Sequence, residues 1–208
     1  MRTLTIGGCT FDIIPIVKGL QSYSEQVSEA LENNTYDAAS VALGIEEVES
    51  IRRRSEIEGE YESSDLDLVY SHLLKDFGPI DMPDPSFTAL IDRCSEMGIP
   101  VIPLDMNDED YTRLYCDTVT TMEFLREKRI IKKAMKKEFD KSSPEAFVTE
   151  WDALINEIKG YARMSAYREE YIAGQIIDTA KYRKHVLTVI EYERLDGILS
   201  IIGGEDGL

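Results

Sequence analysis

Carboxylates that follow predicted strands are the residues of this 208-residue chain best placed to do chemistry. Asp105 comes directly after a short apolar run, and Glu191 and Glu193 lie two residues apart where another run ends. On a continuing strand both glutamates would point to one face, and with Asp105 they could form a general acid/base or hard-cation site. The alternatives are a helix cap for Asp105 and a solvated strand end for the two glutamates.

Two arginines accompany these carboxylates. Arg168 lies in a predicted helix, and its planar guanidinium suits either recognition of an anion or an ion pair with a carboxylate such as Asp105. Arg194 directly follows Glu193; it would point away from the glutamates on a continuing strand, whereas a turn there would free all three side chains.

Four short apolar runs must position these side chains. They cover residues 4–6, 38–43, 99–104 and 186–190. Runs of this length, separated by helical patterns, are typical of buried strands, and ligands of such open sheets bind where the strands end. We therefore predict a single α/β domain over residues 1–208, with a central, mostly parallel sheet flanked by helices.

The helical pattern is strongest in the second half of the chain. No strand pattern occurs between residues 108 and 180, which predicts an α-helical insertion at about 108–165 before the last strands. A stripe of Phe124, Ile131, Met135 and Phe139 predicts one helix over 118–139, and Ser143-Pro144 opens the next. This hairpin, 118–161, could form a homodimer around Phe139 and Trp151 or pack onto the core.

Weaker patterns complete the prediction. The first strand leads through a Gly7-Gly8 turn to a helix over 17–31. Residues 46–77 are expected to be helical, with a break near Glu58-Gly59 and a cap at Ser63-Ser64-Asp65. Residues 198–202 are predicted as a further short strand, and 203–208 as a frayed tail.

Charge and composition exclude several classes of protein. The chain has 40 acidic and 23 basic residues, and its net charge of −17 argues against nucleic-acid binding. No apolar run approaches the roughly 18–20 residues of a membrane span, and no secretory signal begins the chain. Three cysteines in no metal-binding spacing are typical of a reducing cytoplasm, so we expect a cytoplasmic protein.

The order of short motifs at residues 6–10, 40–43, 101–105, 167–173 and 189–198 resembles the TraB/PrgY/GumN family, which has the erythromycin-esterase/ChaN-like fold. Gly7, Asp105 and Arg168 match the pattern of this family. The resemblance implies a metal-dependent hydrolase whose ligands are histidines and carboxylates. Thr10 and Arg194 stand at the two histidine positions, however, and Ala42 at a carboxylate position.

These departures predict that the metal chemistry is lost, because no imidazole or thiolate ligand remains in the motifs. We expect no metal and no cofactor, and a binding or regulatory protein, a pseudoenzyme, whose partner is a small molecule or peptide held by Gly7, Thr10, Arg168 and Arg194. One alternative is a divergent hydrolase that uses the three carboxylates with the arginines. The other is a structural protein that forms oligomers.

Overall fold

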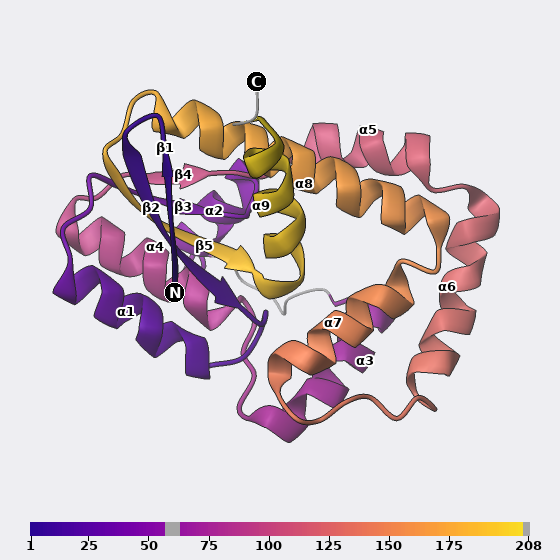
Figure 1. Cartoon of the computed structure of the whole chain (residues 1–208). Coiled ribbons are helices and arrows are strands. Elements are labelled where there is room, and N and C mark those ends of the chain that lie inside the picture. The colour runs from indigo at the N-terminus through magenta and orange to yellow at the C-terminus, as the bar shows by residue number, and fades with distance from the viewer. Residues whose placement is uncertain (57–62, 206–208) are drawn as a thin grey trace.

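A single five-stranded sheet organises the computed structural model, which describes residues 1–56 and 63–205. Its strands lie in the order β1-β2-β5-β3-β4 (Figure 1). β1 is antiparallel to β2, and the other neighbouring pairs are parallel. The strands are β1 (Arg2–Ile6), β2 (Cys9–Ile16), β3 (Ala38–Val41), β4 (Val101–Pro103) and β5 (His185–Glu191). The predicted α/β class with a mostly parallel sheet is confirmed.

Helices cover both faces of this sheet, and further helices lie beyond the carboxyl end of β5 (Figure 1). α1 and α4 pack on one face, and α8 and α9 on the other. The described helices are α1 (Ser22–Asn33), α2 (Ile45–Arg52), α3 (Asp65–Leu74), η1 (Lys75–Phe77), α4 (Pro85–Met97), α5 (Asp108–Thr118), α6 (Thr121–Ala134), α7 (Pro144–Ile155), α8 (Lys159–Ala180) and α9 (Tyr192–Glu205).

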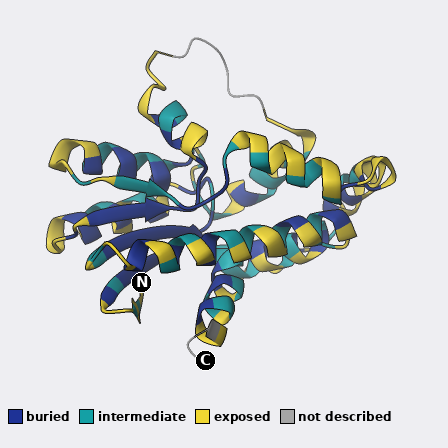
Figure 2. Cartoon of the chain, turned by 90° about the horizontal axis from the view of Figure 1, so that it is seen from above, coloured by how far each residue is buried: buried dark blue, intermediate teal, exposed yellow. Residues whose placement is uncertain are grey.

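The sheet is buried between two hydrophobic cores (Figure 2). β2 contributes to both, because alternate side chains of a strand point to opposite faces. Phe11 and Ile13 pack with α8 and α9, whereas Ile14 and Ile16 pack with α1 and α4. The side chains of β5 alternate between the two cores in the same way. Packing on both faces of the sheet therefore fixes where these strands end and where the side chains at their ends lie.

Several local predictions are confirmed by the caps of the helices. Asp84 accepts hydrogen bonds from the backbone N–H groups of Ser86 and Phe87 at the start of α4. Ser64 caps α3, and Ser143 caps α7 with Pro144 in the first turn. The predicted absence of strands in the insertion also holds, since residues 108–180 form α5 to α8 and their connections.

The strand prediction is wrong at two places. Gly7 and Gly8, with φ of 55° and 87°, form a hairpin turn, and residues 9–16 continue as β2 instead of leading directly to a helix. Asp12 and Pro15 interrupt the apolar run of this segment, so the sequence pattern did not indicate a strand there. Residues 198–202 lie in α9 and not in a strand, and α9 extends to Glu205, so the expected tail is helical up to that residue.

The predicted helix over 118–139 is in fact the end of α5 followed by α6, which Thr120 caps. The predicted stripe is consequently out of phase, because α6 buries Ile130 and Ala134 while Phe124 and Met135 are exposed. The expected break near Glu58-Gly59 and residues 206–208 lie outside the described residues.

Phe139 and Trp151, the centre of the predicted dimer interface, are buried inside this chain. They are 7% and 8% exposed, and their rings lie 6.1 Å apart between centroids. Packing onto the chain's own core therefore accounts for both residues, and any dimer through 118–161 would need other contacts. Among the described residues, no helix is long and apolar enough to cross a membrane.

Candidate functional site

The carboxyl ends of the four parallel strands surround a pocket of about 390 Å³. Lys18 follows β2, Leu43 follows β3, Asp105 follows β4, and Glu191 is the last residue of β5. The loops after β3 and β4 approach closely: a Cβ atom at Gly44 would lie 2.6 Å from the Met106 carbonyl oxygen. This edge is where open parallel sheets bind ligands, and the size suits a small molecule.

One half of the pocket is a hydrogen-bonded ion pair between α8 and the end of β4. Arg168 Nε donates to Asp105 Oδ2 at 2.8 Å, and Arg168 Nη2 donates to the same oxygen. Asp105 Oδ1 accepts from the Met106 backbone N–H at 2.8 Å. The side chains are 17% and 4% exposed, respectively. Asp105 does not cap α5, because Asn107 does so.

Arg168 stays cationic in this buried position. Burial by itself would lower the pKa of its guanidinium, but the negative charges of Glu191 and Asp105 outweigh burial and raise it. Of the two alternatives for Arg168, the structure thus forms the ion pair with Asp105. The pair fixes the orientation of the guanidinium at the wall of the pocket.

The other half of the pocket is not fully bonded. Arg194 Nε lies 4.0 Å from Glu191 Oε1, too far for a hydrogen bond, although the two side chains are only 12% and 7% exposed. Within the described residues, Glu191 Oε2, Glu193 Oε2 and the Nε and Nη1 atoms of Arg194 are buried without a hydrogen-bond partner. Buried polar atoms are almost always bonded, so this concentration of exceptions in one pocket requires a physical explanation.

A strand-to-helix turn brings these three side chains together. β5 ends at Glu191 and α9 begins at Tyr192, so Glu193 lies in the first turn of a helix and not two positions further on a strand. An acidic residue in that turn interacts favourably with the helix dipole. Of the arrangements considered from sequence, the turn that frees Glu191, Glu193 and Arg194 is the one formed.

Glu193 has the most perturbed acidity among the carboxylates of the pocket. Burial and then the charge of Glu191 raise the pKa of its carboxyl to about 7, while Arg194 acts in the opposite direction. Burial also raises the pKa of Glu47, which lines the pocket from α2. A carboxyl group that titrates near neutral pH can both accept and donate a proton.

Gly7 and Thr10 are not brought to this pocket. Gly7 lies in the β1–β2 turn, and Thr10 pairs with His185 at the start of β5, so both belong to the opposite end of the parallel strands. Asp105, Arg168, Glu191, Glu193 and Arg194 do come together. Lys18 was missed because it follows β2, and the apolar end of that strand, Ile13-Ile14-Pro15-Ile16, was the only signal for it.

The residues of the pocket do not fit a hydrolytic metal ion. Lys18, Arg168 and Arg194 line the same pocket as the carboxylates, and these cations would repel a metal ion while neutralising its ligands. In residues 1–56 and 63–205, no group of three histidine, cysteine, aspartate or glutamate side chains could hold a metal ion.

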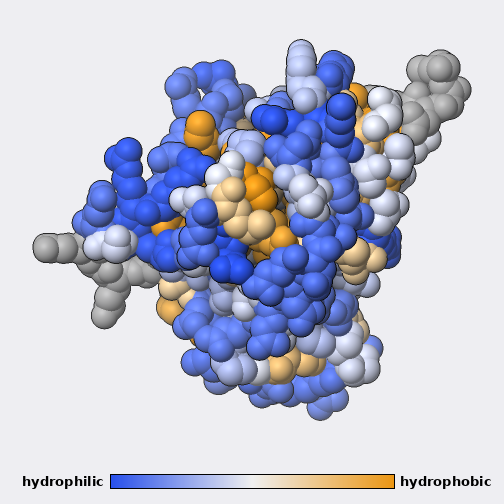
Figure 3. Space-filling view, turned by 90° about the vertical axis from the view of Figure 1, so that its left-hand side faces the viewer, coloured by the Kyte–Doolittle hydropathy of each residue, from blue (hydrophilic) through white to orange (hydrophobic). Residues whose placement is uncertain are grey.

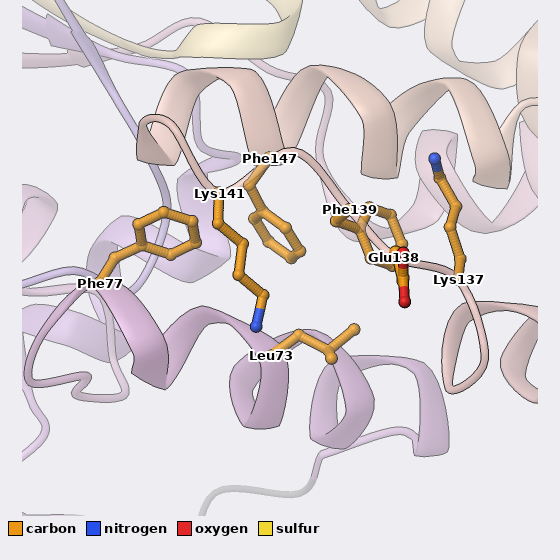
Figure 4. Close-up of a pocket in the computed structure, with 7 residues that line it drawn as sticks. All are labelled: Leu73, Phe77, Lys137, Glu138, Phe139, Lys141 and Phe147. Carbon is orange, nitrogen blue, oxygen red and sulfur yellow. The ribbon is translucent and has the colours of Figure 1, made fainter.

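Further cavities lie in the helical half of the chain, one of them, of about 330 Å³, between α5 and α8. A groove of about 450 Å³ shares Tyr111, Arg168 and Arg194 with the pocket described above. A separate cavity of about 420 Å³ is lined by Leu73 and three phenylalanines between α3 and α7 (Figure 4). The two lysines at this second cavity are already paired, Lys137 with Glu150 and Lys141 with Asp76, so nothing there calls for a charged ligand.

Comparison of the chain with protein-family models, curated proteins and solved structures finds no match. The geometry of the pocket is thus the structural observation that bears on the function of the chain.

Proposed function

We propose that this chain is a divergent TraB-like protein that binds a small charged molecule at the carboxyl edge of its sheet, without metal-dependent hydrolysis. The order of motifs supports the family assignment. The observation that carries the binding function is the set of buried atoms without partners on Glu191, Glu193 and Arg194. A protein that binds no ligand here would be expected to pair or replace such groups, because each unpaired buried group destabilises the folded state.

The chemistry of these atoms defines the ligand that fits. Arg194 offers N–H donors that lack an acceptor, and a carboxylate is geometrically well suited to them. Glu191 and Glu193 offer acceptor oxygens and require donors, for which an ammonium group is suited. An α-amino acid in its zwitterionic form is a small ligand that carries both a carboxylate and an ammonium group.

Thermal unfolding with increasing L-alanine tests this proposal. A ligand that binds only the folded state raises the melting temperature with its concentration. We expect L-alanine to do so, and Arg194→Leu or Glu191→Gln to abolish the shift. Arg126→Leu, an exposed substitution on α6, should leave the shift unchanged. The absence of a shift in the parent protein would contradict the proposal, as would an unchanged shift in both pocket variants.

The metal part of the proposal has a separate test. Protein purified without chelator should contain far less than one equivalent of zinc, manganese or iron per chain. A stoichiometric metal that Asp105→Asn or Glu191→Gln releases would overturn this part.

A divergent hydrolase is the second candidate, favoured by one observation: the Glu193 pKa of about 7 suits a general acid/base at neutral pH. The test is a screen of ester, peptide and phosphate substrates with the parent protein and Glu193→Gln. A hydrolase should lose turnover by roughly 10²–10⁴-fold in the variant, since that is the usual contribution of such a group. A binding protein should show no turnover in either form.

A further inference from the structure

We infer that the ligand of this pocket is an α-amino acid with an aromatic side chain, an inference that rests on the proposed function and specifies its ligand. The charged pocket adjoins the 450 Å³ groove, because Tyr111, Arg168 and Arg194 line both. A zwitterion held at Arg194 and Glu191 would therefore have its side chain directed along an existing groove.

Four of the eleven side chains that line the groove are aromatic. Tyr115 of α5 and Tyr161 of α8 have ring centroids 6.3 Å apart, and Phe124 of α6 lines the groove from the third side. Tyr161 is held in place, since its hydroxyl donates to Glu127 Oε2 at 2.5 Å. Aromatic rings prefer neighbours at this range of separations in tilted or offset arrangements, so these side chains suit an aromatic ring better than a flexible alkyl chain.

Charge at the junction of the two cavities favours the same ligand. The Arg168 guanidinium carbon lies 5.8 Å from the centroid of the Tyr111 ring, within the range of a cation–π contact. A ring that enters the groove meets this Arg168–Tyr111 pair as well as the aromatic walls. Phe124 is exposed to solvent, although apolar side chains of this size are usually buried. A bound aromatic side chain would cover it.

Calorimetric titration of the full chain with L-phenylalanine and L-alanine tests the inference. We expect phenylalanine to bind at least tenfold more tightly than alanine. Phenylalaninamide lacks the carboxylate and N-acetylphenylalanine lacks the ammonium group, so each should lose at least tenfold relative to phenylalanine. These two analogues also distinguish a free amino acid from the end of a peptide, which keeps only one of the two charges.

Groove variants provide the matched comparison. Tyr115→Ala and Phe124→Ala should reduce the affinity for phenylalanine toward that for alanine, without changing the affinity for alanine. Phe124 is already exposed, so its variant should fold even if Tyr115→Ala does not. Tyr182→Ala, at an exposed tyrosine after α8, is the control and should change neither affinity.

The titrations distinguish binding of an aromatic amino acid from binding of amino acids in general. Equal affinities of the parent protein for phenylalanine and alanine would overturn the aromatic inference and leave the proposed function standing. An affinity for phenylalanine that survives both groove substitutions would also overturn the inference. Failure of the parent protein to bind either amino acid would overturn the inference and the proposed function together.

Discussion

Two buried polar clusters lie at opposite ends of the same strands, β2 and β5, and they differ in how completely they are bonded. At the amino end, Asp12 accepts hydrogen bonds from Thr3 at 2.8 Å and Tyr36 at 3.2 Å. The two ring nitrogens of His185 lie 2.9 Å from Asp12 Oδ2 and 2.9 Å from the Thr35 carbonyl oxygen. At the carboxyl end, Glu191, Glu193 and Arg194 carry buried atoms with no partner among the described residues.

The carboxyl groups of the two clusters also have pKa shifts in opposite directions. Burial opposes ionisation of Asp12, but hydrogen bonds from Thr3, His185 and Tyr36 outweigh burial and lower the pKa of its carboxyl. Burial and the charge of Glu191 raise the pKa of Glu193 instead. The amino-end cluster therefore has its partners built into the fold. The face seen from the left-hand side of Figure 1 is mostly hydrophilic, with some hydrophobic residues near its centre (Figure 3). The carboxyl-end cluster lacks such partners among the described residues, and this lack is the basis of the proposed ligand binding.

Removing Asp12 should have the largest effect on stability. Asp12→Ala leaves the Tyr36 hydroxyl and the His185 ring without a buried acceptor, so we expect the free energy of unfolding to fall by about 2–3 kcal/mol. Urea unfolding measures the change. Asp196→Ala, which removes an exposed ion pair with Arg2, should change stability by less than about 0.5 kcal/mol. Equal effects of the two substitutions would show that the bonds of Asp12 stabilise the fold no more than an exposed ion pair does.

The pH dependence of stability should reveal Glu193. Its folded pKa of about 7 lies above the unfolded value of 4.5, so the folded state binds the extra proton between these values. Stability should accordingly fall as pH rises from about 4.5 to about 7, by roughly 2 kcal/mol more in the parent protein than in Glu193→Gln. Urea unfolding across this range is the measurement. Parallel pH profiles of the free energy of unfolding for the two proteins would show that burial does not raise the pKa of Glu193.

Removing the unbonded pair should have the smallest effect and the opposite sign. The double variant Glu191→Gln/Arg194→Met exchanges two poorly paired charges for less costly groups, so we expect unchanged stability or a gain of about 1 kcal/mol. Glu25→Gln/Arg126→Met makes the same changes at exposed positions and serves as the control. A loss above about 2 kcal/mol that the control does not show would place this pair with the bonded cluster.

Local signals in the sequence were sufficient for the class of fold. The apolar runs at 38–43 and 99–104 contain strands β3 and β4, and the run at 186–190 lies within β5. Capping residues such as Asp84 and Ser143 begin helices where expected. Because parallel strands place their carboxyl ends at one edge, Asp105 and Glu191 could also be assigned to a common site. Those inferences depend only on periodicity, caps and strand polarity.

Tertiary structure decided the rest, because it depends on contacts between distant residues. β2 is a strand in spite of Asp12 and Pro15, since β1 and β5 pair with it on both sides and Tyr36 and His185 satisfy Asp12. Because residues 9–16 form β2, Thr10 lies near the start of this strand and Lys18 follows its end. Lys18, and not Thr10, therefore lines the pocket at the carboxyl ends of the strands. The bonding of Asp105 to Arg168, 63 residues away, and the lack of partners around Arg194 likewise follow from how α8 and α9 pack on the sheet, which no local pattern encodes.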